Sequence, residues 1–523
     1  YNSSDLTYFK LDTDVDLNDG LLDSEGNLTS SSHNIWASIG TTSNPAKISF
    51  DGNGKTISGL YINGGSNVGL FGVLAEGSSV SNLALTSSYV SGSSNVGGLL
   101  GTSTSATLTS VSYAGVVNGS TNVGGIVGSM SGTLTSVNNT AVVSANSSNV
   151  GGIAGSLTSA TLTTSSNTGS VSASISTAVG GLVGSATDVT LTYSANTGSV
   201  SGRNSVGGII GLSDSDSLGS LTAGNVNLGN ITSDGSATGG IIGTLQNTSS
   251  ATNAVEANIN YGTIAASSSV GGIIGSSTAT SNLIITQNLN AGSFTGSTSS
   301  GVIGSASSTS GITNNYYDIQ TVSGATGAIS GAETSNVAES AYSSNLTSGS
   351  YFSSAYLSQS AGLYPVPATI SLPTTISDKI YVSSAPVILS TSGTAETLTS
   401  VSSDFSIPTN SSYSWSDSEG KITFDTSAGT ATIASGYKGS TDITVAFGSA
   451  SRTFTVNVNS IASCVVTLED YDDAFYVYRG FEIRPAVASV KVGLRTLDPS
   501  EYTVTYSGNN AVNAAATLTV TPT

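Results

Sequence analysis

The strongest constraint on the fold is a glycine-rich string that recurs along the first 304 residues. Its common form is V-G-G-apolar-apolar-G, as in VGGIVG at 123–128, and successive copies lie 27 to 32 residues apart. A single G-x-G-x-x-G between a strand and a helix is typical of a dinucleotide-binding turn. Repetition at a near-constant period, with no helical pattern after any copy, instead predicts a stack of repeats and excludes a phosphate-binding loop. The final glycines of the nine copies are Gly72, Gly101, Gly128, Gly155, Gly184, Gly211, Gly243, Gly275 and Gly304.

Two further marks recur within the periods. Together with the glycine string they divide a period into three short β-favouring stretches, separated by turns rich in Gly, Asn and Ser. The pattern therefore predicts an all-β protein whose main domain is a three-sided β-solenoid of about nine coils. The first mark is T-L-T, at 107–109, 133–135, 161–163 and 190–192, and the second is N-x-G-x-apolar, beginning at Asn167, Asn196, Asn227, Asn260 and Asn290.

Stacking of the coils, about 4.8 Å apart, predicts which residues meet. The leucines of the T-L-T segments should form an internal aliphatic column, and a set of asparagines should form a hydrogen-bonded ladder at a turn. Each pair of adjacent glycines precedes two adjacent apolar residues, and a corner or bulge there would turn both toward the core. The leucines are Leu108, Leu134, Leu162 and Leu191, and the asparagines are Asn95, Asn122 and Asn149.

The threonines that flank these leucines favour an exposed strand face. A flat array of such pairs could also order water, as an ice-binding surface does. The copies are irregularly spaced, however, and they end after Thr192, where the stretch SDSDSLGSLTAG follows. An ordinary exposed face is therefore the preferred interpretation.

Charged side chains are scarce, which limits the partners expected. Only 8% of residues are charged, and 31 acidic residues against 12 basic ones give a net charge of −19. Nucleic acids and anionic membranes require basic patches, so neither is expected as a partner. No apolar run reaches the length of about 18 residues that spans a bilayer, so no membrane insertion is expected in this segment.

Catalysis requires titratable groups, and this chain has few. His33 is the one histidine, so a zinc site of the H-E-x-x-H type cannot form, and a Ser-His-Asp triad would have to use a residue of the N-terminal region. Arg203 is the one basic residue between Asn95 and Val302, whereas polysaccharide lyases built on solenoids need clustered acidic and basic side chains. The sequence therefore predicts a protein that is not an enzyme and that holds no cofactor, with calcium as the one candidate.

The ordered series of motifs resembles the GLUG repeats of bacterial surface proteins. The repeated strings are preceded by segments similar to the family's leader and followed by segments similar to its closing cap. The resemblance covers residues 1–367 and implies a right-handed β-solenoid in a secreted or wall-attached protein, often an adhesin. The leader segments are TDVDL (13–17), IWASIG (35–40) and FDGNGKTISGLYI (50–62), and the cap segments are NNYYD (314–318) and LYPVP (363–367).

The composition changes after Pro367, and the periodicity stops. Residues 412–458 show short alternating strands broken by turns and resemble a bacterial immunoglobulin-like domain, with Trp415 in the place of the core tryptophan. Residues 478–522 resemble tandem repeats of Gram-positive surface proteins, which usually occur in series. We therefore expect two immunoglobulin-like β-sandwich modules, at 368–460 and 461–523, the second smaller and continuing beyond this sequence.

Two acidic clusters are candidates for calcium. In the stretch 11–25, four residues occupy positions 1, 3, 5 and 12 of an EF-hand loop, although position 6 lacks the glycine that the sharp turn needs. A second cluster lies near the junction of the two C-terminal modules, where calcium would stiffen a hinge. A solvated acidic strand or loop is the alternative at both places. The first set is Asp14, Asp16, Asn18 and Glu25, and the second is Asp470, Asp472 and Asp473.

These observations predict a non-enzymatic, extracellular protein of the cell surface, similar to an adhesin. The solenoid would be displayed on the immunoglobulin-like modules and would attach to a glycan or protein of a host cell, a neighbouring cell or the matrix. The alternative is a structural subunit of a filament or surface layer, in which solenoid ends or terminal strands pair with copies of the same chain.

Overall fold

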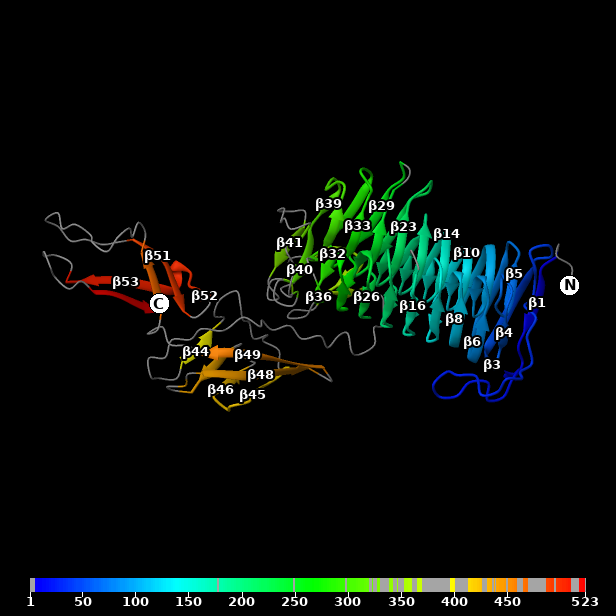
Figure 1. Ribbon diagram of the computed structural model, residues 1–523, viewed down its shortest axis with the longest axis horizontal. Helices are drawn as coiled ribbons and strands as arrows, with labels where there is room; N and C mark the ends of the chain where they lie inside the picture. The colour runs from blue at the N-terminus through cyan, green and yellow to red at the C-terminus, as the bar shows by residue number, and fades with distance from the viewer. Residues whose placement is uncertain are drawn as a thin grey trace. The chain divides into compact units, whose positions relative to one another are not determined.

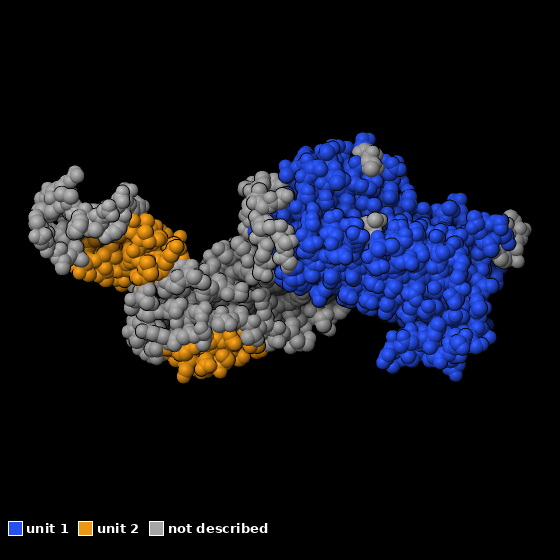
Figure 2. Space-filling view, in the orientation of Figure 1, with its two compact units in different colours: residues 1–373 blue, residues 374–523 orange. Residues whose placement is uncertain are grey.

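The structure, a computed structural model of residues 1–523, divides into two compact units, Tyr1–Pro373 and Thr374–Thr523 (Figure 2). It describes residues 5–318 apart from 176–177, 248–249 and 297–298. Beyond 318 it describes shorter segments: 322, 327–329, 338–341, 346, 352–359, 365–368, 396–399, 413–425, 430–434, 437, 439–447, 450–458, 464–468, 486–492, 495–508 and 517–522.

The first unit is a β-solenoid of about nine turns, in which each turn pairs in parallel with the turns before and after it (Figure 1). Its short strands stack into five ladders, and several longer strands run through more than one of them. The first ladder holds the Val-Gly pairs of the repeated string, replaced by Thr-Gly in β27 and by Ser-Ser in β37: β7 (Ser94–Gly97), β9 (Thr121–Gly124), β13 (Val150–Gly151), β17 (Val179–Gly180), β22 (Val206–Gly207), β27 (Ser236–Gly239), β32 (Ser268–Gly271) and β37 (Ser299–Ser300). The second begins at the end of the same string: β5 (Phe71–Leu74), β18 (Val183–Thr187), β23 (Ile210–Asp214), β28 (Ile242–Leu245), β33 (Ile274–Ser277) and β38 (Ile303–Ala306). The third comprises β1 (Thr7–Lys10), β19 (Thr190–Thr192), β24 (Ser220–Ala223), β29 (Asn253–Glu256), β34 (Leu283–Thr286) and β39 (Ile312–Thr313).

The remaining two ladders complete each turn. The fourth comprises β2 (Val15–Asp16), β11 (Asn138–Asn139), β15 (Ser166–Asn167), β20 (Ala195–Asn196), β25 (Val226–Asn227), β30 (Ile259–Asn260), β35 (Leu289–Asn290), β40 (Asn315–Asp318) and β41 (Ala338–Ala341). The fifth comprises β4 (Tyr61–Asn63), β12 (Val142–Ala145), β16 (Val171–Ala173), β21 (Val200–Gly202), β26 (Ile231–Ser233), β31 (Ile264–Ala266) and β36 (Phe294–Gly296). The longer strands are β3 (Ile48–Ser58), β6 (Ser78–Ser91), β8 (Leu100–Gly119), β10 (Val127–Thr135) and β14 (Ala154–Thr163), and a short antiparallel pair, β42 (Leu357–Ser358) and β43 (Val366–Pro367), follows the stack.

A full turn thus contains more strands than the three stretches that the sequence predicted. The extra breaks are single residues in the left-handed backbone conformation, such as Ser136 and Thr164, which separate the third ladder from the fourth. Few residues other than Gly or Asn adopt this conformation, so propensity alone does not place such corners at Ser or Thr. Their places are set by the pairing of each turn with its neighbours.

The predicted aliphatic column is confirmed. Leu134 pairs in register with Leu108 on one side and Leu162 on the other, and Leu162 pairs with Leu191. All four side chains are fully buried. The column continues beyond the T-L-T segments through Thr222, Val255, Ile285 and Ile312.

The predicted asparagine ladder is confirmed as well, at the corner where the first ladder of strands begins. The amide of Asn122 donates to Oδ1 of Asn95 over 2.8 Å, and that of Asn149 donates to Asn122 over 2.8 Å. Asn95 in turn donates to Asn67, so the ladder begins one turn earlier than predicted. All four residues have φ between 51° and 57°, a left-handed conformation that Asn tolerates better than most residues.

Two further asparagine ladders, neither of them expected from the sequence, run through the buried interior. Each amide except the last of its ladder donates to the Oδ1 of the asparagine one turn on, over 2.8 to 3.0 Å, and every side chain is fully buried. A buried amide costs free energy unless it is hydrogen-bonded, and stacking meets that requirement for the amides that donate along the ladder. One ladder comprises Asn139, Asn167, Asn196, Asn227, Asn260 and Asn290, and the other Asn225, Asn258, Asn288 and Asn315.

The glycine pairs form the predicted bulge. The N–H groups of Ile126 and Val127 both donate to the carbonyl oxygen of Ile153, over 3.0 and 2.9 Å, and both side chains are fully buried. A further reason for glycine appears at the second residue of the pair. A Cβ at Gly181 would lie closer than 3.0 Å to Asn196 of the buried ladder and to the carbonyl oxygen of Gly208 in the next turn. The glycines therefore let neighbouring turns and the asparagine ladder approach closely.

The longer period after Thr192 is accommodated by a loop at 215–219, which Asp188 holds from the preceding turn. The Asp188 carboxylate accepts N–H groups of Asp216 (2.8 Å), Ser217 (3.0 Å) and Gly219 (3.1 Å). Burial alone would raise the pKa of Asp188, but these backbone hydrogen bonds outweigh it and hold the pKa below its usual value.

Replacing Asp188 by Asn should therefore lower stability and also flatten its dependence on pH. Because the folded pKa lies below the unfolded one, the carboxylate contributes stability at neutral pH that is lost as the pH falls through the acid range. We expect a loss of about 1–3 kcal/mol at neutral pH. Urea unfolding at neutral and acidic pH should show the variant and the wild type converging in acid, and an unchanged gap between them would contradict this role.

The second unit contains only antiparallel pairs among its described strands. Trp415 of β45 stacks on Phe424 of β46, with ring centroids 5.3 Å apart, and so joins strands that belong to two different sheets. The strands are β44 (Glu396–Thr399), β45 (Tyr413–Asp417), β46 (Ile422–Asp425), β47 (Thr430–Ile433), β48 (Gly439–Phe447), β49 (Ala450–Val458), β50 (Val465–Leu468), β51 (Val487–Val492), β52 (Arg495–Thr496), β53 (Tyr502–Ser507) and β54 (Thr517–Pro522).

Candidate ligand site at the N-terminal cap

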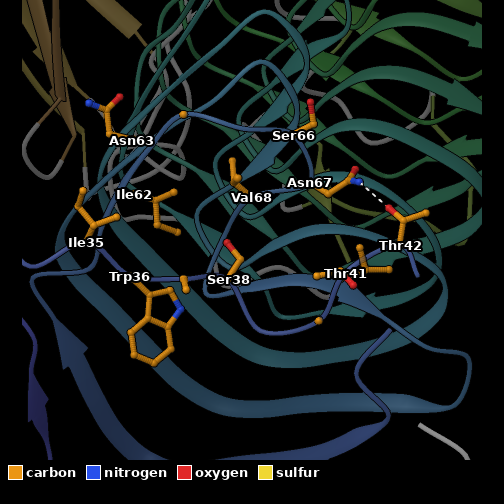
Figure 3. Close-up of a pocket in the computed structure, with 14 residues that line it drawn as sticks. Ile35, Trp36, Ser38, Thr41, Thr42, Ile62, Asn63, Ser66, Asn67 and Val68 are labelled. Atoms are coloured by element: carbon orange, nitrogen blue, oxygen red, sulfur yellow. Dashed lines mark hydrogen bonds between the residues drawn. The ribbon is translucent and has the colours of Figure 1, made fainter. Parts of the chain in front are cut away.

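A pocket of about 320 Å³ opens at the N-terminal end of the solenoid (Figure 3). Its lining combines apolar side chains with neutral hydrogen-bonding groups, and it includes no Asp, Glu, His, Lys or Arg. Pockets for small ligands typically combine an apolar wall with a few polar groups in this way. The side chains that matter most here are Ile35, Trp36, Asn63, Ser66, Asn67 and Val68.

One wall of this pocket is the segment 35–42, which crosses the first turns. Hydrogen bonds from the backbone N–H of Trp36 to the carbonyl oxygen of Tyr61 (2.8 Å) and from Trp36 Nε1 to the carbonyl oxygen of Leu70 (3.1 Å) fix the segment. At Gly40 the backbone is left-handed, with φ of 84°, and a Cβ there would meet backbone and side-chain atoms of Ala46. Only glycine fits this turn.

The opposite wall comes from β4 and the corner that follows it. Asn67 begins the corner ladder and donates from its amide to Oγ1 of Thr42 over 3.2 Å, which joins the two walls (Figure 3). Asn63 and Ser66 are exposed at the mouth, and the Ile35 side chain is 69% exposed. The mouth therefore presents an amide, a hydroxyl and an aliphatic side chain to solvent.

A row of three aromatic side chains borders the pocket. We call His33, Tyr61 and Tyr89 the aromatic row: the ring centroids of His33 and Tyr61 are 5.0 Å apart, and those of Tyr61 and Tyr89 are 5.8 Å apart. The amide of Asn63 donates to the hydroxyl of Tyr61 over 3.4 Å, and that of Asn118 to the hydroxyl of Tyr89 over 3.3 Å. Because Asn63 also lines the pocket, the row and the pocket are continuous.

His33 has a structural partner in this row. Its Nε2 lies 2.7 Å from the carbonyl oxygen of Ser30, which can only accept a hydrogen bond, so Nε2 carries the proton. The ring is half-buried against Tyr61. From the sequence, His33 was expected to form no catalytic or metal site.

Three residues of the first predicted calcium cluster make hydrogen bonds within the cap. Asp14 accepts the N–H of Thr56 over 2.8 Å, and Asp16 accepts that of Asn18 over 3.1 Å. The amide of Asn18 donates to backbone oxygens of Asn34 and Gly59, over 3.0 and 2.8 Å. Asn18 thus ties three segments of the cap together.

The fourth residue of this cluster, Glu25, takes part in a different set of hydrogen bonds. Glu25 belongs to a tight turn organised by Asp23, whose carboxylate accepts N–H groups of Glu25 and Asn27 over 2.9 and 2.8 Å. These bonds hold the pKa of Asp23 below its usual value, that from Asn27 most of all. Within the described ranges no group of three or more His, Cys, Asp or Glu side chains is arranged to hold a metal ion. The second predicted cluster, Asp470, Asp472 and Asp473, lies outside the described residues.

The threonine pairs prove more regular than their sequence spacing indicated. Thr107, Thr133, Thr161 and Thr190 pair in register, and so do the threonines two residues after each of them. The expected irregular register was wrong, because the additional residues of each period lie in loops between ladders. The array is four turns long and ends where Leu221 and Ala223 take the two positions.

Neither the pocket nor the aromatic row was expected from the sequence. Trp36 lies in one of the leader segments, and Tyr61 near the end of another. The available signal was the first corner asparagine, Asn67, which stands at the same place before its glycine string as Asn95 does. The pocket depends on contacts between residues about 25 to 35 positions apart, such as Asn67 with Thr42 and Trp36 with Leu70.

Comparisons with known proteins add little to this geometry. No protein-family model and no curated protein matches the chain. Among solved structures, the crystal structure at 1.30 Å of a candidate immunoglobulin A1 protease from Bacteroides ovatus matches with 17% identity and a TM-score of 0.33. The match covers 58% of this chain and 78% of that chain. A TM-score this low supports no statement about activity. No helix in the described ranges is long and apolar enough to cross a membrane.

Proposed function

We propose that this chain is a non-enzymatic, extracellular protein of the cell surface, which attaches to a glycan or protein of another cell or of the matrix in the manner of an adhesin. In this proposal the solenoid is right-handed and three-sided, and it is displayed on immunoglobulin-like modules at 368–460 and 461–523. The observation that supports attachment is the uncharged pocket with its bordering aromatic row. Its lining can hold a ligand by shape and hydrogen bonds but includes no group with which to move a proton.

Binding of the purified full chain to surfaces tests this function. We expect the fluorescently labelled chain to bind saturably to a panel of bacterial and epithelial cells and to extracellular matrix, and unlabelled chain should compete. Incubation with the bound material should release no product. Failure to bind any surface, or turnover of a polysaccharide or protein substrate, would overturn the proposal.

A structural subunit of a filament or surface layer is the second candidate, and the first strand favours it. β1 pairs with β3 on one side, and no strand in the described ranges pairs with its other edge. Its Tyr8 and Phe9 side chains are 75% and 46% exposed. An unpaired edge with exposed aromatic residues can template a further strand. Sedimentation at rising concentration separates the two candidates: a chain that stays monomeric supports attachment, whereas assembly that Tyr8→Lys abolishes supports a filament.

Calcium remains part of the proposal for both acidic clusters. At 470–473 an ion would offset the repulsion between the three carboxylates and stiffen the junction of the terminal modules.

A further inference from the structure

We propose that the uncharged pocket binds one residue of a neutral saccharide and that the aromatic row carries the residues next to it. This inference rests on the proposed function, because it names the ligand class and the place on the solenoid where attachment occurs. Three features of the N-terminal cap support it: the lining of the pocket, the lack of charged side chains in that lining, and the continuity of the pocket with the aromatic row.

The lining of the pocket matches the two kinds of surface that a sugar ring offers. A sugar ring has faces of C–H groups and a rim of hydroxyls. Ile35 and Val68 supply apolar contact area, while Ser66 and Asn63 supply a hydroxyl and an amide at the mouth. Hydroxyl and amide groups both donate and accept hydrogen bonds, as sugar hydroxyls do. A volume of about 320 Å³ lies at the lower end of the range for small-ligand sites, about 300–1,000 Å³, and suits one ring rather than a large cofactor.

The absence of charged side chains from the lining selects against ionised ligands. Carboxylate, sulfate and phosphate groups are usually bound by Arg or Lys, or by a helix N-terminus, and the pocket offers none of these. An ammonium group would need a carboxylate or an open aromatic face near it, but no Asp or Glu lines the pocket, and the indole of Trp36 packs against the hydrophobic core. Because an unpaired charge loses hydration on entering such a site, a neutral saccharide is favoured over a sialylated or uronic-acid glycan.

Continuity with the aromatic row indicates a ligand longer than one residue. Asn63 lies in the pocket wall and donates to the Tyr61 hydroxyl, and Tyr89 stands on the next turn, with its ring centroid 5.8 Å from that of Tyr61. Tyrosine offers an apolar ring together with a polar tip, a combination enriched where one side of a residue meets a ligand and the other meets water. The row therefore extends the contact surface from the pocket along the outside of the first turns.

Titration of the full chain with uncharged oligosaccharides tests the inference. The probes are trisaccharides of glucose, galactose, mannose and N-acetylglucosamine in α and β linkage, with sialyllactose and a uronic-acid trisaccharide as charged counterparts. Calorimetry or ligand-observed NMR should detect at least one neutral trisaccharide bound at least tenfold more tightly than either charged one. Ser66→Trp should fill the mouth and weaken this binding at least tenfold. Tyr89→Ala should weaken the trisaccharide at least threefold while leaving the monosaccharide within twofold.

A matched variant controls for folding. Ser66 Oγ lies 2.8 Å from Ser93 Oγ in the next turn, and Ser144 Oγ likewise lies 3.1 Å from Ser172 Oγ, farther along the solenoid. Ser144→Trp therefore removes an equivalent hydrogen bond away from the pocket and should leave saccharide binding unchanged. Thermal melts of both variants should agree within a few degrees.

The outcomes separate this inference from the proposed function. Equal binding of charged and neutral probes, no binding of any neutral probe, or undiminished binding by Ser66→Trp would overturn the saccharide site. If Ser66→Trp still attaches to cells as the wild type does, the site is wrong and attachment stands. If the wild type binds a neutral trisaccharide but no cell or matrix surface, the site stands and the proposed attachment function is wrong.

Discussion

Leu134→Asp should unfold the middle of the solenoid at neutral pH. Leu134 is fully buried and paired between Leu108 and Leu162, so the substitution places an unpaired carboxylate between two turns of the aliphatic column. Loss of the leucine contacts alone costs about 2–5 kcal/mol, and burial of an unpaired charge adds several more. Each turn is stabilised by its neighbours, so disrupted pairing at one turn weakens both sides of the break. Circular dichroism during urea unfolding measures the loss.

Thr133→Asp is the matched control for this substitution. Thr133 lies one position earlier on the same strand and is only partly buried, with Thr107 and Thr161 beside it. Its replacement should cost no more than about 1 kcal/mol, the range of strand propensity. The Leu134→Asp loss should also shrink in acid, because burial raises the pKa of the new carboxyl group and its neutral form is easier to bury. Equal stability of the two variants would mean that the assignment of inner and outer positions is wrong.

Gly181→Ala should destabilise the solenoid strongly for the addition of a single methyl group. The new Cβ would lie closer than 3.0 Å to the Gly208 carbonyl oxygen and to the Asn196 side chain. Neither can move freely, since Asn196 is fully buried and bonded to Asn167 and Asn227 in the ladder. Overpacking of this kind costs about 1–3 kcal/mol and sometimes more, and here it also strains two ladder hydrogen bonds.

Gly77→Ala separates this clash from the general cost of replacing a glycine. Gly77 has φ of 78°, and a Cβ there would meet no atom within 4 Å. The substitution therefore incurs only the strain of a left-handed backbone, about 1–2 kcal/mol. The midpoint of urea unfolding should fall further for Gly181→Ala than for Gly77→Ala. The reverse order would show that the close approach of turns does not explain the glycine pairs.

Much of the solenoid could be predicted because the same residue types return at the same place in each period. Stacked turns bring identical side chains into contact, so a recurring leucine indicates an internal column and a recurring asparagine indicates a ladder. Leu134 and Asn122 were placed correctly on this ground alone. The threonine register was misjudged because loop lengths vary between periods while the strands remain aligned. The spacing of motifs along the sequence adds the length of the loops to that of the strands, so it does not show that the strands stay aligned.

The buried amides could not be predicted in the same way. Asparagine is usually exposed, and N-x-G is typical of a turn, so the local sequence around Asn196 gives no indication of burial. Its burial is tolerable only because Asn167 donates to its Oδ1 and Asn227 and Gly198 accept from its Nδ2. Two of these partners come from other turns and are no nearer in the sequence than 29 residues.

The sequence by itself determined the repeated parallel fold, the inner leucine column and the scarcity of charge, because each depends on residue type and period alone. Only the tertiary structure decided where amides are buried, why Gly181 must be glycine and that Trp36, Asn63 and Asn67 share one pocket. Those features depend on atoms of different turns that approach within hydrogen-bonding or van der Waals distance. Such an approach is set by how the turns stack and how the N-terminal segment crosses them. Neither arrangement can be read from the linear sequence.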